Sequence, residues 1–150
     1  NKQLTEKFKI SHNLSSFTMG PFHTSFVKIA KQYLNSPYLW GGRTPLGIDC
    51  SGFTQMVYRF FKIQLPRDAS QQVKKGKEIL NLTNAKLGDL VFFNTKESVT
   101  HVGIYLGNNH IIHSSGKVRI DKLDTKGIFN EDSQSYTHML KIIKRVLLIT

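Results

Sequence analysis

The sequence predicts an α+β fold in which helices come first and an antiparallel sheet follows. Two segments of the first half, 24–35 and 50–62, repeat apolar residues at helical spacing. From residue 88 onward the apolar residues instead form short runs that are separated by turn-forming residues. Because the helices precede the strands and do not alternate with them, we expect a helical part packed on an antiparallel meander.

Three helices are expected, over 24–35, 50–62 and 69–75. The side chains of Thr24 and Asp68 can cap the first and the third. Pro37 follows the first helix, and the loop over 36–48 is rich in glycine and proline. These signals separate the first helix clearly from the second.

Five strands are expected, over 90–93, 100–106, 110–113, 118–120 and 142–149. Gly107-Asn108-Asn109 forms the turn between the second and the third. Residues 121–138 are polar, and a short helix is the only element expected there. The apolar run Val146-Leu147-Leu148-Ile149 is expected to be buried at the end of the last strand.

Length and composition fit one globular domain. The 150 residues suffice for a core, and 39% of them are hydrophobic while 21% are charged. No apolar run approaches the length of a membrane span. Residues 1–22 are polar and aperiodic, so we expect an N-terminal arm or linker before a domain over 23–150. Since the chain starts with Asn1, we also expect an upstream segment to have been removed or left out.

The strongly basic charge favours anionic partners. The net charge is +11 and the pI is about 9.9. The basic residues are scattered, however, and their densest group, Lys74, Lys75 and Lys77, lacks the interleaved aromatic residues of a nucleic-acid groove. We therefore expect a solvated basic surface and no specific nucleic-acid site, although charge alone leaves nucleic-acid binding open.

Cys50 is the only cysteine of the chain, so an internal disulfide is excluded. It stands at the predicted start of the helix over 50–62, where unpaired backbone N–H groups and the positive end of the helix dipole favour a thiolate. A lone cysteine is also commonly a small buried apolar residue. Cys50 is therefore a candidate nucleophile that requires a base.

The hairpin around Gly107-Asn108-Asn109 can supply that base. A three-residue turn would pair Leu106 with His110 and Gly103 with His113. His101 and His113 then share one face of the sheet, together with Gly103, whereas a two-residue turn would place the two histidines on opposite faces. The residues expected on the other face are Val102, Ile104, Leu106, His110 and Ile112.

Gly103 leaves room for a close approach, so we expect the cysteine helix to lie across the histidine face. Cys50 would then meet His101 as its base, with His113 orienting that base. His110 is expected to be structural. A zinc site formed by Cys50, His101 and His113 is an alternative, although their spacing is not that of common structural zinc sites.

Six short sequence motifs occur in order along the chain. They are Pro37-Tyr38-Leu39-Trp40-Gly41-Gly42, Gly47-Ile48-Asp49-Cys50-Ser51-Gly52-Phe53, Leu65-Pro66-Arg67-Asp68-Ala69, Gly88-Asp89-Leu90-Val91-Phe92-Phe93, His101-Val102-Gly103-Ile104-Tyr105-Leu106-Gly107-Asn108 and Ile112-His113-Ser114-Ser115. In this order they resemble the NlpC/p60 family, which are bacterial papain-like cysteine peptidases of the cell wall. The resemblance runs from about residue 26 to 120 and resumes weakly at Arg145-Val146-Leu147.

The resemblance implies a papain-like fold and hydrolysis of peptidoglycan stem peptides, without a cofactor or metal. It implies that Cys50 is the nucleophile, His101 the base and His113 the third member of the triad. Tyr38 matches the tyrosine beside the cysteine that helps to hold the reaction centre or its oxyanion. The backbone N–H of Cys50 is a further oxyanion donor.

The motifs are most similar to the γ-D-glutamyl-L-diamino acid endopeptidase subgroup. This similarity implies that Asp49 binds the free amine of the substrate and that Ser51 and Ser70 contact its D-glutamate part. Arg67 is a candidate partner for the substrate carboxylate and equally a candidate structural pin. Members of the subgroup carry upstream SH3-like modules that help to close the site, whereas only some two dozen residues precede the first helix here. We therefore expect either a fragment or a stand-alone catalytic domain with a more open site.

The implied partners are peptidoglycan or murein-derived peptides, with anionic wall polymers as a further candidate. The implied location is the cell envelope or the exterior, and a cytoplasmic recycling role stays open. Two alternatives also stay open: a thiol amidase or acyltransferase that acts on another substrate, and a non-catalytic wall-binding module.

Overall fold

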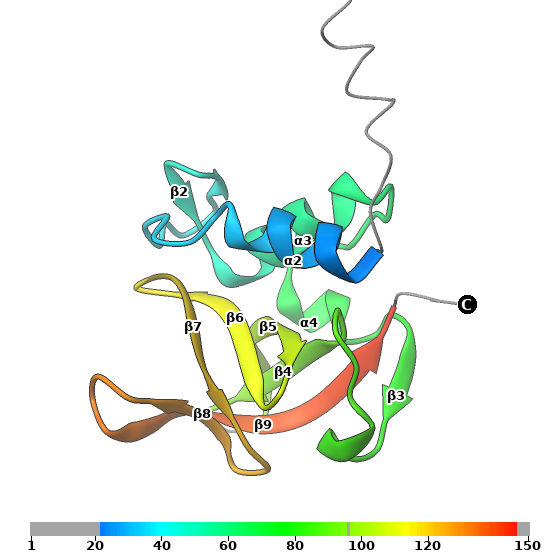
Figure 1. Ribbon diagram of the computed structural model, residues 1–150, viewed down its shortest axis with the longest axis vertical. Coiled ribbons are helices and arrows are strands. Elements are labelled where there is room, and N and C mark those ends of the chain that lie inside the picture. Colours follow the sequence, from blue (N-terminus) through cyan, green and yellow to red (C-terminus); the bar gives the residue numbers. More distant parts are fainter. Residues whose placement is uncertain (1–21, 96, 147–150) are drawn as a thin grey trace, which may run out of the picture.

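The computed structural model describes residues 22–95 and 97–146, in which a helical layer lies against a β-barrel (Figure 1). The helices are α2 (Phe22–Lys31), α3 (Cys50–Phe60) and α4 (Ala69–Gln72), with a 3₁₀ turn η2 (Leu82–Asn84). The strands are β1 (Arg43–Thr44), β2 (Gly47–Ile48), β3 (Lys77–Ile79), β4 (Leu90–Asn94), β5 (Val99–Gly107), β6 (His110–Ser115), β7 (Lys117–Leu123), β8 (Gly127–Asn130) and β9 (Ser135–Arg145). The expected mixture of helices and an antiparallel sheet is confirmed. None of the described helices is long and apolar enough to cross a membrane.

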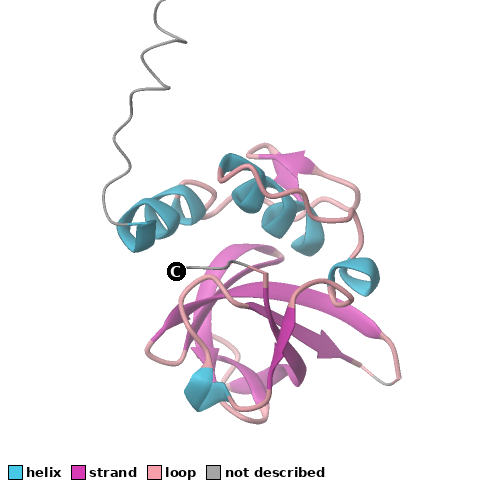
Figure 2. Ribbon diagram, turned by 90° about the vertical axis from the view of Figure 1, so that its right-hand side faces the viewer, coloured by secondary structure: helices cyan, strands magenta, loops and turns pink. Residues whose placement is uncertain are grey.

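The barrel closes because β9 pairs with two strands that lie far apart in the chain. The sheet order is β3-β9-β4-β5-β6-β7-β8, and β9 also pairs with β8, which returns the sheet to its start. Six strands, β4 to β9, thus form a ring that is visible in Figure 2, with β3 attached to one end of β9. β9 also carries His138, whose ring lies against His101 of β5 and His113 of β6.

Two hydrophobic clusters lie on the two sides of the barrel wall. One cluster packs Phe53 and Val57 of α3 on Val102, Ile104 and Ile112 of the sheet. The other takes a residue from each of the six ring strands and fills the barrel interior. Its members are Val91, Phe93, Tyr105, Ile111, Leu123, Ile128 and Ile143. Since side chains alternate along a strand, His101, Gly103 and Tyr105 face the interior.

The register of the β5–β6 hairpin is confirmed at Gly103 and His113 but not at the turn. Gly103 pairs with His113, as expected, whereas His110 pairs with Gly107 and not with Leu106. The turn has two residues, Asn108 and Asn109, with φ of 50° and 57°. A bulge between Tyr105 and Gly107 adds one residue, so the two histidines still share a face.

The expectation that the cysteine helix covers the histidine face is wrong. α3 packs on the outer wall at Val102 and Ile104, whereas His101 and His113 point to the interior side. Gly103 also serves another purpose. A Cβ at Gly103 would lie 2.7 Å from Ile111 Cδ1 and 2.9 Å from His113 Cβ, so its small size makes room for His113 and not for a helix.

Several element boundaries differ from the expectation. α2 begins at Phe22, so Thr24 lies within it, and it ends at Lys31, before Asn35. α3 ends at Phe60, and α4 ends at Gln72. The expected arm over 1–22 lies outside the described residues except for Phe22, and so do residues 147–149 of the last expected strand.

The segment over 121–138 contains β8 and the start of β9, so the short helix expected there is wrong. Its polar residues form turns that hide the strand pattern. The carboxylate of Asp124 accepts a hydrogen bond from the backbone of Lys126 at 2.7 Å, and the side chain of Asn130 accepts one from Asp132 at 2.9 Å.

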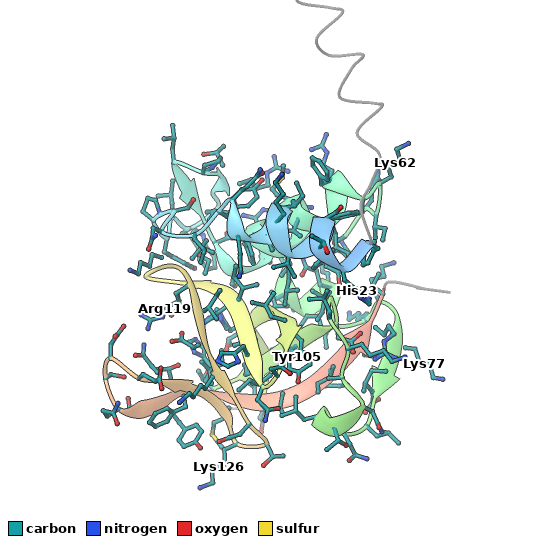
Figure 3. The ribbon with its side chains drawn as sticks, in the orientation of Figure 1. His23, Lys62, Lys77, Tyr105, Arg119 and Lys126 are labelled. Atoms are coloured by element: carbon teal, nitrogen blue, oxygen red, sulfur yellow. The ribbon has the colours of Figure 1, made fainter. Side chains whose placement is uncertain are left out.

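The three lysines that are labelled among the described residues lie apart from one another. Lys62, Lys77 and Lys126 lie at separate edges of the molecule in the view of Figure 3. Four basic side chains of the described residues have an acidic partner: Arg67, Arg119, Lys122 and Arg145.

Candidate active site

The helix start that carries Cys50 is fixed by neighbouring polar contacts. Asp49 is the N-cap, and its Oδ1 accepts the backbone N–H of Gly52 at 2.7 Å. The backbone carbonyl of Ile48 accepts the hydroxyl of Ser114 at 2.8 Å, which ties the start of α3 to β6. Cys50 is buried, with 9% of its surface exposed.

The thiol of Cys50 lies against the strand that carries His101. The backbone N–H of Val102, the residue after His101, bonds to the sulfur, as do those of Ser51 and Cys50 itself. Burial raises the pKa of the Cys50 thiol, and these three N–H groups lower it by less. The expectation that the helix start favours a resting thiolate is therefore wrong, because desolvation and the neighbouring Asp49 carboxylate outweigh the N–H groups.

A buried line of hydrogen bonds leads away from His101. Its Nε2 lies 2.8 Å from Nδ1 of His113, and Nε2 of His113 lies 2.8 Å from Oδ2 of Asp121. The guanidinium of Arg119 holds the same carboxylate with bonds of 2.7 and 2.9 Å. Arg119 also bonds to the exposed Asp132 at 2.8 Å. The sequence reading identified the two histidines but missed Asp121 and Arg119.

The carboxylate of Asp121 determines where the protons of this line lie. A carboxylate only accepts, so Nε2 of His113 donates to it. Burial lowers the pKa of His113, so the ring is neutral and its Nδ1 is an acceptor. Nε2 of His101 therefore donates to His113, and Nδ1 of His101 carries the free lone pair. A neutral His101 with an unprotonated nitrogen is a competent general base.

A third histidine, His138 of β9, stacks on His101. The ring centroids lie 4.0 Å apart and the planes meet at 25°. Burial and the neighbouring His113 lower the pKa of His138 to about 4. Burial, His113 and His138 likewise hold the pKa of His101 well below its usual range. His138 was missed because residues 121–138 do not show the strand pattern that places it.

The carboxylate of the N-cap residue Asp49 accepts hydrogen bonds from several neighbouring groups. Arg67 forms a two-pronged pair with Asp49, at 2.6 Å to Oδ2 and 3.0 Å to Oδ1. Oδ2 also accepts the backbone N–H of Gly41 at 2.8 Å. Arg67 further donates to the hydroxyl of Ser51 at 3.0 Å. Burial opposes ionisation of Asp49, but hydrogen bonds from Arg67 and the backbone outweigh it and lower the pKa of the carboxyl.

The remaining expected site residues lie at the exposed side. The Tyr38 side chain is 37% exposed, and burial, followed by the neighbouring charges of Cys50 and Asp49, raises its pKa. Ser70 is exposed on α4. Tyr38 therefore belongs to the immediate surroundings of Cys50, whereas no described hydrogen bond joins Ser70 to the other site residues.

The alternative zinc site with Cys50 is not the cluster that forms. Among the described residues, one potential ligand nitrogen each from His101, His113 and His138 lies within 4.8 Å of the other two, and Cys50 is not among them. Cys50 is joined to this part of the sheet through the backbone N–H of Val102, the residue that follows His101.

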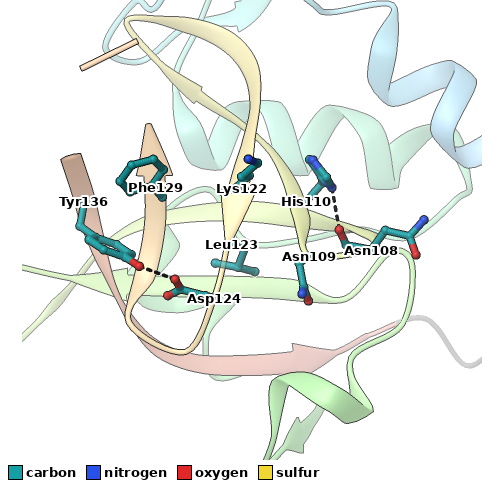
Figure 4. A pocket seen from close by; sticks show the side chains of 8 residues that line it. All are labelled: Asn108, Asn109, His110, Lys122, Leu123, Asp124, Phe129 and Tyr136. Atoms are coloured by element: carbon teal, nitrogen blue, oxygen red, sulfur yellow. Dashed lines mark hydrogen bonds between the residues drawn. The ribbon is translucent and has the colours of Figure 1, made fainter. Parts of the chain in front are cut away.

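A hollow of about 460 Å³ lies elsewhere, beside the Asn108-Asn109 turn (Figure 4). It is lined by Asn108, Asn109, His110, Lys122, Leu123, Asp124, Phe129 and Tyr136. The hydroxyl of Tyr136 donates to Asp124 there, and His110 bonds to the backbone of Asn108 at 2.7 Å. None of the expected site residues lines this hollow.

Comparison with known proteins identifies the family. Residues 35–136 match the model of the NlpC/P60 family. The chain is 36% identical to a gamma-D-glutamyl-L-lysine dipeptidyl-peptidase of Bacillus cereus, over 74% of this chain and 35% of the relative. It is 40% identical to a probable endopeptidase NlpC homolog of Haemophilus influenzae, over 79% of this chain and 63% of the relative. The chain thus spans between about a third and two thirds of these relatives.

Solved structures agree. A crystal structure of an NlpC/P60 family protein from Bacillus cereus aligns with a TM-score of 0.72 at 32% identity, covering 86% of this chain and 41% of that one. The NlpC/p60 domain of the peptidoglycan hydrolase SagA aligns with a TM-score of 0.61 at 34% identity, covering 67% and 88%. This chain belongs to the NlpC/P60 family.

Proposed function

We propose that this chain is a papain-like cysteine peptidase that hydrolyses peptidoglycan stem peptides at the bond between γ-linked D-glutamate and a diamino acid. The observation that carries the proposal is the buried line from His101 through His113 to Asp121, together with the hydrogen bond from the backbone N–H of Val102, the residue after His101, to the sulfur of Cys50. The names of the relatives, a gamma-D-glutamyl-L-lysine dipeptidyl-peptidase among them, support the substrate class.

In the first step, Nδ1 of His101 takes the proton of the Cys50 thiol while the sulfur attacks the amide carbonyl. A carbon–sulfur bond forms, and the carbonyl electrons move to oxygen. Backbone N–H groups at the start of α3 and the hydroxyl of Tyr38 are the donors proposed for this oxyanion. His113 and Asp121 stabilise the imidazolium that forms, because each accepts a hydrogen bond from the group before it.

In the second step, His101 gives the proton to the leaving amine as the carbon–nitrogen bond breaks, which leaves a Cys50 thioester. Water then attacks the thioester with His101 again as base, and the thiol is restored. His101 and Cys50 are both neutral at rest. Because the pKa of His101 is low, the imidazolium that forms gives its proton readily to the leaving amine.

The substrate contacts are proposed for Arg67, Ser51 and Ser70, which would hold the D-glutamate part. Asp49 already receives donors from Arg67 and two backbone N–H groups. A substrate ammonium can bind this carboxylate only by sharing it with Arg67. We therefore propose that Asp49 orients Arg67 and that recognition of a free amine depends on how far Arg67 moves.

The proposed location is the cell envelope or the exterior, where peptidoglycan occurs. The net charge of +11 favours association with anionic wall polymers through long-range attraction. We expect this attraction to weaken as salt concentration rises.

The test is incubation with L-Ala-γ-D-Glu-L-Lys and with the corresponding meso-diaminopimelate tripeptide, followed by mass spectrometry of the products. We expect release of the free diamino acid, loss of all release in Cys50→Ala, and near-normal release in the control His110→Gln, which changes a histidine outside the line. Equal cleavage by the parent and by Cys50→Ala would refute the cysteine mechanism. An added amine that captures the acyl group in place of water would indicate an acyltransferase.

A further inference from the structure

Three imidazole rings gather at the inner end of the site, although the proposed hydrolysis uses only two of them. His101 and His113 lie edge to face with centroids 5.0 Å apart, and His138 stacks on His101 at 4.0 Å. One potential ligand nitrogen of each ring lies within 4.8 Å of the other two. The third ring comes from β9, which pairs with β4 on one side and β8 on the other.

Each ring can direct one nitrogen to a shared point. Nδ1 of His138 bonds to the hydroxyl of Thr137 at 2.9 Å, which leaves its Nε2 free. Nδ1 of His113 and Nε2 of His101 already face each other at 2.8 Å. The other nitrogen of His113 bonds to Asp121, and a carboxylate behind a histidine is the usual second partner of a metal-bound imidazole.

We propose that His101, His113 and His138 form an inhibitory binding site for Zn²⁺. Zinc favours imidazole ligands, and a three-histidine set leaves a fourth position for water. Tetrahedral zinc–nitrogen bonds of about 2.05 Å place the nitrogens about 3.3 Å apart. The separation of 2.8 Å between His101 and His113 therefore has to open by about half an ångström, and His138 has to close in.

Metal binding changes the proton arrangement of the line. Three zinc–nitrogen bonds form, and the hydrogen bond from Nε2 of His101 to Nδ1 of His113 breaks. Its proton moves to Nδ1 of His101, the nitrogen that would otherwise accept the Cys50 proton. His101 is then no longer a base, so zinc inhibits hydrolysis. The inhibition rests on the proposed function, whereas the binding itself does not.

The binding test uses the Cys50→Ala protein, so that neither the thiol nor turnover contributes. Zinc is titrated in competition with a chromophoric chelator, and Co²⁺ absorption reports the geometry. We expect one equivalent to bind at micromolar concentration with a tetrahedral Co²⁺ spectrum. Loss of a second-shell partner costs metal affinity 10–100-fold, so loss of the ligand in His138→Gln should weaken binding by at least about 100-fold. His110→Gln is the matched control and should bind zinc like the parent.

Absence of zinc binding by Cys50→Ala at micromolar concentration would refute the site, and so would undiminished binding by His138→Gln. If His138→Gln does not fold, histidine ¹⁵N spectra of the Cys50→Ala protein decide the question, because zinc must shift exactly three rings. Zinc inhibition of the unmodified enzyme, reversed by chelator, completes the test. If the tripeptides are not cleaved at all, the proposed function fails while the binding result stands.

Discussion

Removing the carboxylate of Asp121 tests the proposed proton arrangement directly. In Asp121→Ala, Nε2 of His113 loses its acceptor, so nothing holds the proton on that nitrogen. The His113 proton can then move to Nδ1, which faces His101 and would oppose its Nε2–H. In Asp121→Asn, the amide oxygen can still accept from His113, so the arrangement is kept with a weaker acceptor.

The structure gives the expected size of each effect. The Asp121 side chain is 4% exposed and bonds to His113 and to Arg119, which is 19% exposed. Removing one partner of a buried ion pair lowers the free energy of unfolding by about 3–5 kcal/mol. We expect the lower end for Asp121→Ala, because Arg119 still bonds to Asp132 and is partly exposed to water. A loss of about 3 kcal/mol lowers the melting temperature by roughly 6–12 °C. For activity we expect kcat to fall roughly 100-fold or more in Asp121→Ala and by less in Asp121→Asn.

The assay compares kcat and KM for the tripeptide together with thermal melts of all three proteins. A positioning role predicts that kcat falls while KM changes little, and that asparagine restores part of the activity. Histidine ¹⁵N shifts should show His113 protonated on Nε2 in the parent and mixed in Asp121→Ala. Equal kcat values for the two variants, or an unchanged His113 tautomer, would refute the reasoning.

Three further predictions follow from the site. Arg67→Gln should lower the melting temperature at pH 7, and the deficit should shrink as the pH falls below about 3.9, because the lowered pKa of Asp49 stabilises the fold only while that carboxyl is ionised; a deficit independent of pH would contradict this. Iodoacetamide should label Cys50 more slowly at pH 7 than it labels free cysteine, and the rate should still rise above about pH 8.5, because burial raises the thiol pKa; labelling that levels off below that pH would contradict it. Gly103→Ala should cost about 1–3 kcal/mol in chemical denaturation and lower kcat, since its Cβ would lie 2.7 Å from Ile111 and displace the base's partner; a stable, fully active variant would count against the close contact.

Local sequence patterns were sufficient to predict most strands of the barrel and part of the candidate site. The boundaries of β4, β5 and β6 and of the helix that begins at Cys50 were predicted to within about two residues. The shared face of His101 and His113 was also predicted, although the turn itself was wrong, because the bulge and the shorter turn compensate.

The wrong predictions concern features that the alternation of residues along a strand does not determine. Alternation places His101 and His113 on one face but does not say whether helix or barrel interior covers that face. The small size of Gly103 was expected to let a helix approach the sheet. In the structure the space beside Gly103 is instead filled by the side chains of Ile111 and His113. In the hairpin of β8 and β9, turn-forming aspartate and asparagine residues interrupt the alternation, so the strand that carries His138 was missed.

The sequence by itself determined the α+β order, the cysteine at a helix start and the pairing of Gly103 with His113, because each follows from neighbours in the chain. Tertiary structure alone decided the rest. The pairing of β9 with β4 and β8 brought His138 onto His101, and strand pairing placed Asp121 behind His113. Burial then raised the pKa of Cys50 against the pull of its helix. Desolvation and pairing between distant strands depend on the whole fold, so no local pattern contains them.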